Sequence, residues 1–200
     1  EGMTYIPEAM LMSTNLQHVE LPSTVTTIKA GAFRFSKLTS VTFPSSLQVI
    51  EDYAFSDNAL TTITLPSSLT HLFNGAFANN RLTTLTIPEN VREISDEAFQ
   101  NNALRDVTLP HGLTTIWRWA FQNNQLTTVQ IPSTVTSIGD SAFSHNELTT
   151  ITLPSAIKTI ALDVFTSNPL TTLTLEGTET TIYSGFLVNK AGESLKALYK

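Results

Sequence analysis

The residues best suited to form a site lie in TTIWRWAFQNN, residues 114–124, which holds both tryptophans of the chain. There Trp117 and Trp119 flank Arg118. Aromatic side chains and arginine often anchor protein interfaces. The segment is therefore either a binding site or a local variation in a scaffold, and the rest of the chain must decide between the two.

No recognisable catalytic or metal-binding motif occurs in the chain. Its histidines are His18, His71, His111 and His145. None has a serine or aspartate at a spacing that forces a catalytic triad. A His-Glu-x-x-His motif, a glycine-rich phosphate loop and an Asp-x-Asp calcium loop are all missing. The acidic run of Glu89, Glu93, Asp96 and Glu97 is more typical of a solvated face than of a metal site. We therefore expect no enzyme activity, no metal and no cofactor.

Composition narrows the class of protein further. Two hundred residues, 41% hydrophobic and 14% charged, predict one soluble domain with a sizeable core. No apolar run approaches the roughly 18 residues of a membrane span. The net charge of −6 and the scattered basic residues argue against nucleic acid as a partner. Cysteine is absent, so disulfides are excluded. Because the chain opens on Glu1 without a leader segment, we expect a mature or excised piece of a longer protein.

The chain repeats every 22 residues. Proline recurs at positions 22, 44, 66, 88, 110, 132 and 154, and phenylalanine at 33, 55, 77, 99, 121, 143 and 165. Leucine and further apolar columns keep the same step. One unit buries too few apolar side chains to offset the entropy of ordering its backbone. Neighbouring units must therefore stack into a solenoid.

The residue pattern of each repeat predicts a strand, then a corner, then a turn. Residues 62–65 alternate outward and inward, as a strand does, and the proline that follows removes a ladder donor and ends it. Asp52, Asn74, Asp96 and Asp140 then suit the N-cap of a short helix or 3-10 turn. Asparagine recurs at 58, 80, 102, 124, 146 and 168, where we expect it to hydrogen-bond the backbone of the next coil.

The unit resembles the BspA-like leucine-rich repeats of bacterial surface proteins. The pattern that carries the resemblance is L-x-x-I-x-L-P-x-x-L-x-x-[IL]-x-x-x-A-F, as from Leu60 to Phe77, and it extends over about residues 3–187. The chain departs from the family in carrying asparagine where a cysteine is frequent, and in its slightly short unit. The resemblance implies an α/β solenoid with a parallel β-sheet on the concave face and short helical or 3-10 turns on the convex face.

Three segments follow from the register of the repeat. Residues 1–15 form an N-terminal half repeat or cap, because Met3, Ile6, Met10 and Leu11 align one period before Val25, Ile28, Ala32 and Phe33. Residues 16–169 form seven regular repeats. Residues 170–200 form a degenerate last repeat and a C-terminal cap, in which 193–200 is expected to be a displaced final strand or cap, with more sequence beyond it.

The concave face is the usual partner surface of horseshoe repeats, as the resemblance implies. Its outward columns are rich in threonine and are interrupted by His18 with Glu20 and by Arg105 with Asp106. The candidate ligand-binding residues on this face are His18, Glu20, Thr62, Thr64, Thr84, Thr86, Arg105, Asp106, Thr108, Thr128, Gln130, Thr150 and Thr152. Plain β-propensity explains the threonines equally well. An ice-binding threonine array is a minor alternative, which Asp106, Gln130 and Ser40 disfavour.

The tryptophan segment occupies columns that also hold Lys, Glu and Gly, so its indoles are expected on the convex side. A second candidate ligand-binding site there comprises Tyr53, Phe73, Trp117, Arg118 and Trp119. The alternative is structural cover, in which Arg118 pairs with Asp96 and Asp140 of the neighbouring coils.

The resemblance implies a non-catalytic recognition module, secreted or at the cell surface. We expect a bacterial adhesin segment that binds a host or matrix protein, with glycan binding at the aromatic patch as a variant. A purely structural spacer or stalk is the alternative.

Overall fold

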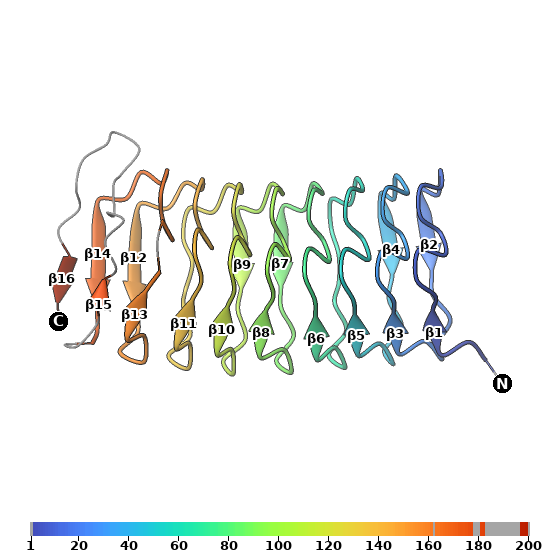
Figure 1. Cartoon of the computed structure of the whole chain (residues 1–200), viewed down its shortest axis with the longest axis horizontal. Helices are drawn as coiled ribbons and strands as arrows, with labels where there is room; N and C mark the ends of the chain where they lie inside the picture. Colours follow the sequence, from blue (N-terminus) through green and yellow to red (C-terminus); the bar gives the residue numbers. More distant parts are fainter. Residues whose placement is uncertain (1, 162, 178–180, 183–196, 200) are drawn as a thin grey trace.

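The structure is a computed structural model that describes residues 2–161, 163–177, 181–182 and 197–199. Coils of the chain stack side by side along one long axis, with β1 and β2 at one end and β14 to β16 at the other (Figure 1). The expected leucine-rich repeat solenoid is confirmed.

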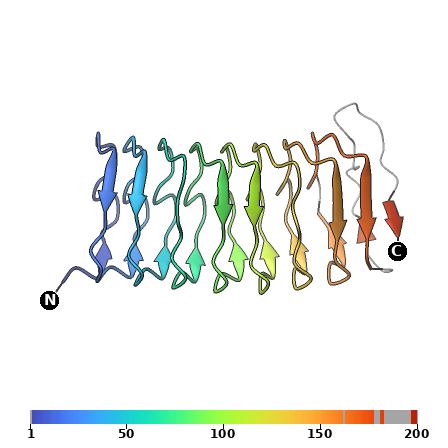
Figure 2. The ribbon, with the colours of Figure 1, turned by 180° about the vertical axis from the view of Figure 1, so that it is seen from behind.

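Two ranks of short strands run along the solenoid, and Figure 2 shows them from behind. The first rank contains β2 (His18–Glu20), β4 (Ser40–Thr42), β7 (Thr84–Thr86), β9 (Asp106–Thr108), β12 (Thr150–Leu153), β14 (Thr172–Leu175) and β16 (Ala197–Tyr199). The second rank contains β1 (Tyr5–Ile6), β3 (Thr27–Ile28), β5 (Val49–Ile50), β6 (His71–Leu72), β8 (Glu93–Ile94), β10 (Thr115–Ile116), β11 (Ser137–Ile138), β13 (Thr159–Ile160) and β15 (Thr181–Ile182). Within a coil, the proline corner joins the first-rank strand to the second-rank strand.

All the paired strands are parallel, and the pairing follows the sequence period. Ile6 lies beside Ile28, Leu85 beside Val107 and Ile116 beside Ile138, each 22 residues apart. The register thus aligns every inward column of the repeat along one core.

The ladders of both ranks are interrupted. In the first rank, residues 62–65 and 128–131 form no strand, so β4 and β9 each lack a hydrogen-bonded neighbour on one side. In the second rank, β6 does not pair with β8, nor β11 with β13. Some neighbouring coils are thus joined by paired strands in both ranks, and others are not.

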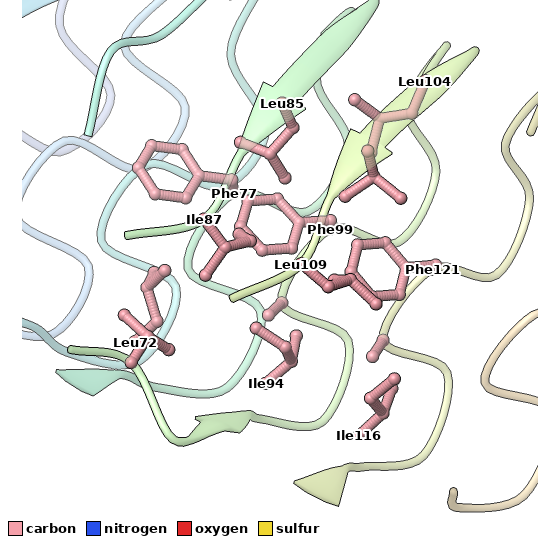
Figure 3. Close-up of a cluster of buried hydrophobic side chains, with 14 of the residues drawn as sticks. Leu72, Phe77, Leu85, Ile87, Ile94, Phe99, Leu104, Leu109, Ile116 and Phe121 are labelled. Atoms are coloured by element: carbon pink, nitrogen blue, oxygen red, sulfur yellow. The ribbon is translucent and has the colours of Figure 1, made fainter. Parts of the chain in front are cut away.

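Stacked phenylalanine rings form the centre of the core. The seven rings from Phe33 to Phe165 follow one another at centroid separations of 5.0–5.9 Å and within 13° of parallel. Figure 3 shows Phe77, Phe99 and Phe121 in one row. Each ring is buried between two coils and covered by the aliphatic columns. Burial of these rings is possible only when the coils stack.

The asparagine that recurs every 22 residues bonds the backbone of a neighbouring coil. Asn124 Nδ2 donates to the carbonyl of Phe99, 25 residues earlier, while its Oδ1 accepts from the amide of Leu104, 20 residues earlier. The same two bonds recur for Asn58, Asn80, Asn102, Asn146 and Asn168. The expected contact with a neighbouring coil is therefore present, but it is made to the preceding coil rather than the next.

The expected α/β class, with helical or 3-10 turns on the convex face, is wrong, because the described residues contain no helix and form a solenoid of parallel β-strands. Each coil instead turns through two residues with positive φ, such as Tyr53 (54°) and Asp57 (59°). A right-handed helical turn needs consecutive residues with negative φ, so these positions interrupt it. The first of the two columns holds Gly31 and Gly75, whose missing Cβ suits this conformation.

The expected N-caps are also wrong, since there is no helix to cap. Asp52 Oδ1 accepts instead from the Asn74 amide, and Asp96 Oδ1 from the Arg118 amide, each at 2.9 Å in the next coil. The aspartate column therefore links consecutive turns.

The ends of the solenoid keep the register of the repeat only in part. In the N-terminal half repeat Ile6 is buried, whereas Met3 and Met10 are 46% and 52% exposed because no coil covers them. At the other end, β16 pairs with β14 within the stretch expected to be a final strand. Most of the expected C-terminal cap lies outside the described residues.

Replacing Asn124 tests the contribution of the asparagine ladder to stability. We expect Asn124→Ala to lower the free energy of unfolding by about 3 kcal/mol, because it leaves the buried amide of Leu104 unsatisfied and leaves the Phe99 carbonyl with Asn102 as its remaining side-chain donor, at 3.2 Å. Urea unfolding followed by circular dichroism measures the change. The control is Asn123→Gly, which removes an exposed amide and its bond to Asn101 Oδ1 at 2.7 Å while keeping the positive φ (54°) easy to adopt. Equal losses in the two variants would contradict the structural importance of the ladder.

Candidate binding surfaces

The outward side chains of the first rank form one exposed face, which we call the threonine face. It contains all the candidate residues of the expected concave site, and every one of them is exposed. The inward neighbours, such as Leu85 and Val107, are buried. The alternation of the sequence thus placed these side chains correctly, while their role in binding stays a prediction.

The two interruptions of the threonine face differ in their contacts. The Nδ1 atom of His18 lies 2.8 Å from Ser40 Oγ in the adjacent strand. Arg105 Nε donates to Gln125 Oε1 at 3.2 Å, in the next coil. Asp106 is left exposed beside Thr84, its partner in β7. Charge on this face is therefore local and sparse.

Three shallow hollows lie where the threonine face meets the proline corner. Their volumes are about 560, 400 and 380 Å³, and they occupy successive gaps between coils from residue 20 to residue 90. Hydroxyl groups of threonine and serine line their sides, while Phe43, Ile63 and Leu65 contribute apolar surface. Two of the hollows flank residues 62–65, where the first-rank ladder is open.

A further pocket of about 280 Å³ lies on the second rank between β6 and β8. His71, Phe73, Glu93 and Ser95 line it. Sequence reasoning selected Phe73 alone as a site residue. The signal that would have found the pocket is the ring of Phe73 in a column whose other members, apart from Trp117, are small or charged.

The expected aromatic patch is not one cluster. Phe73 and Trp117 follow second-rank strands and are 40% and 45% exposed. Tyr53 and Trp119 are half-buried and occupy the turn position with positive φ. The ring contacts join Phe73 to His71 and Trp119 to Arg118. The patch therefore separates into an exposed pair and a pair that covers the turns.

Arg118 links two coils, in agreement with the structural alternative. Its Nη2 lies 3.1 Å from Asp96 Oδ2, and its amide donates to Asp96 Oδ1. The hydrogen bond to Asp96, together with the charges of Asp96 and Asp140, raises the pKa of Arg118. The carboxylate of Asp96 thus holds both the side chain and the backbone of Arg118.

Tyr53 spans several coils. Its ring lies across Gly75, where a Cβ would meet Tyr53 Cε1 at an impossible 2.2 Å. Its hydroxyl donates to Glu97 Oε2 at 3.3 Å, and the Arg34 guanidinium lies 4.8 Å from its ring centroid. Burial, and then the negative charge of Glu97, raise the pKa of Tyr53. Tyr53 therefore behaves as cover for the turns.

Metal and membrane sites were also sought over the described ranges. No three acidic or histidine side chains there come close enough to share an ion. None of those residues forms a helix long and apolar enough to span a bilayer.

The two turn glycines provide a matched test of the Tyr53 contact. Gly31→Ala is expected to cost about 1–2 kcal/mol through the positive φ alone, because its Cβ would meet nothing within 4 Å. Gly75→Ala adds displacement of the Tyr53 ring, so its loss of unfolding free energy should be clearly larger. Thermal and urea unfolding measure both. In a Tyr53→Ala background, Gly75→Ala should lower the unfolding free energy no more than Gly31→Ala does. If it still costs more in that background, the Tyr53 ring is not the cause of the difference.

Raising the pH tests the environment of Tyr53. The pKa of Tyr53 in the folded protein lies above the ordinary value of 10.0. The neutral phenol therefore stabilises the fold fully at pH values below 10.0. The contribution is lost as the pH rises through the folded pKa. We therefore expect the unfolding free energy of the natural chain to fall above about pH 10 more steeply than that of Tyr53→Phe. Parallel pH profiles of the two proteins would contradict this environment.

Solved structures with the same architecture come from bacterial repeat proteins. A leucine-rich repeat protein from Bacteroides ovatus is 25% identical with a TM-score of 0.71, covering 98% of this chain and 58% of its own. A leucine rich cell surface protein from Faecalibacterium prausnitzii is also 25% identical with a TM-score of 0.63, covering 92% and 61%. The pneumococcal vaccine antigen PcpA, 20% identical with a TM-score of 0.59, shares the fold over 93% and 63%. The chain thus spans about three fifths of the length of these proteins.

A search of curated protein sequences found no match. The family model of the BspA type leucine rich repeat region matches residues 4–125 and 72–192, with six copies of the repeat. These matches extend over nearly the whole chain and agree with the stacked coils described above. The chain belongs to the BspA-type leucine-rich repeat family.

Proposed function

We propose that this chain is a non-catalytic recognition module of a bacterial surface protein, and that it binds a host or extracellular-matrix protein through the threonine face. The observation that carries the proposal is the continuous exposed face along the first rank, hollowed at its proline edge. Location at the cell surface, or secretion, is supported by family membership and by the similar cell surface protein of Faecalibacterium prausnitzii.

The composition of the face suits recognition of a protein without strong charge. Its hydroxyl groups both donate and accept hydrogen bonds, and the hollows add apolar surface such as Phe43 and Ile63. The charged residues Arg105 and Asp106 stand at its centre, where they would contribute specificity. An ice-binding role fits less well, because the first-rank ladder is open at 62–65 and 128–131 and the array is not uniform.

Binding to a panel of immobilised extracellular-matrix proteins tests the proposal. For a protein that is retained, we expect Arg105→Thr with Asp106→Thr to weaken the affinity about tenfold, as loss of central interface contacts does. Surface plasmon resonance measures the Kd of each variant.

The control removes one positive and one negative side chain from the second-rank face instead. Lys29→Thr with Glu51→Thr breaks an ion pair of 2.6 Å there and should leave the affinity unchanged. Equal affinity of the natural chain and the Arg105/Asp106 variant would exclude this face. A panel that retains no protein would favour the alternative, a structural spacer.

A further inference from the structure

The gap between β6 and β8 is not closed by backbone hydrogen bonds. In the adjacent gaps the Phe73 amide donates to Ile50 at 3.0 Å and the Trp117 amide to Ile94 at 2.9 Å. The equivalent bond from Ser95 to Leu72 is absent, and Ser95 Oγ donates to the Leu72 carbonyl instead, at 2.7 Å. Among the described residues, the amide of Ser95 therefore has no backbone partner.

The bond expected at the start of these two strands is also absent. Thr114 donates its amide to the carbonyl of Arg92 at 2.8 Å, whereas no amide of the coil that holds β8 donates to Thr70, one repeat earlier. The pocket of about 280 Å³ lies over this open ladder. It thus offers backbone donors and a backbone acceptor that the described chain leaves without backbone partners.

An exposed aromatic surface borders the pocket. The rings of Phe73 and His71 are nearly parallel, at 13° and a centroid separation of 6.0 Å. Opposite them stands Glu93, whose Oε2 accepts from Trp117 Nε1 at 2.9 Å. This bond fixes the exposed indole beyond the pocket. Trp117 lies two repeats after Phe73, about 10 Å away at the usual spacing of parallel strands.

We propose that this pocket binds a neutral glycan, with one pyranose ring in the pocket and the chain extending toward Trp117. The apolar C–H face of a sugar can lie on Phe73, as aromatic rings accept apolar faces. Sugar hydroxyls both donate and accept, which matches the Ser95 amide, the Thr70 carbonyl and the Glu93 carboxylate.

Charged ligands match the pocket less well. A lysine ammonium donates only and would leave the free amides unused. An anionic ligand would face the carboxylate of Glu93. Arg92 also lines the pocket, and its guanidinium lies against Gly112 in the next coil. A neutral polyhydroxylated ligand is therefore the class that the groups favour.

Glycan binding goes beyond the proposed function, because this pocket lies on the second rank rather than on the threonine face. The test begins with a printed array of neutral and acidic glycans. Neutral tetrasaccharides retained on the array are then titrated in solution, with tryptophan fluorescence as the readout. Trp119→Phe in the background leaves Trp117 as the only fluorescent indole.

We expect Phe73→Ser to weaken tetrasaccharide binding at least about tenfold. Serine already occupies the same repeat position at Ser95, so the fold should accept it, and urea unfolding checks this. Trp117→Ser leaves no indole in that background, so its binding is measured by isothermal titration calorimetry, and it should weaken binding of the tetrasaccharide more than that of the matching disaccharide. The matched control is Tyr5→Ala, which removes an aromatic side chain, 51% exposed, from the same rank.

Three results would overturn the proposal: no neutral glycan retained, binding that is insensitive to Phe73→Ser, or preference for a basic peptide. The Arg105/Asp106 variant leaves this pocket intact. Failure of glycan binding with retained matrix-protein binding would therefore leave the proposed function standing.

Discussion

The fold depends on the hydrogen bonds that the backbone of each coil makes with the neighbouring coil. A single coil has short strands, turns without helices and a half-open core, so its amides, carbonyls and apolar side chains all need a neighbour. The asparagine ladder is the strictest form of this dependence, because each side chain bonds a buried carbonyl and a buried amide of the preceding coil. The phenylalanine column provides the corresponding apolar contact. Stability is therefore a property of the interfaces between coils.

The need to stack on a neighbouring coil also determines the backbone conformation of the turns. Two recurring turn positions with positive φ let each coil reverse within a few residues, and glycine, asparagine and aspartate recur there. Tryptophan and tyrosine at the same position are costly for the local backbone. Tyr53 offsets that cost by crossing Gly75 and reaching Glu97. Tyr53 thus covers the turns of the neighbouring coils.

Three of the four pockets described above lie where stacking is incomplete, and the fourth lies beside the paired strands β2 and β4. Both ladders are open between the coil that includes residues 62–73 and the coil that includes β7 and β8, and two of the pockets lie in that gap. Asn90 lines both of them, and its side chain bridges to the Ser67 carbonyl. Departures from the repeat therefore create surface chemistry that a perfectly regular solenoid would lack.

The sequence by itself determined the period, the inward columns and the outward threonine face, because a constant 22-residue step leaves only one register in which apolar columns meet. It also located the asparagine ladder. Only the tertiary structure decided the rest. The aspartate column resembles a helix cap in sequence, but Asp96 bonds the next coil, since the positive φ of Glu97 prevents a helix. Likewise Phe73 and Trp117 separate from Tyr53 and Trp119, because columns only two residues apart face different sides of a turn. The open ladder at β6 and β8 has no signature in the period, as it arises from how neighbouring coils fit together in space.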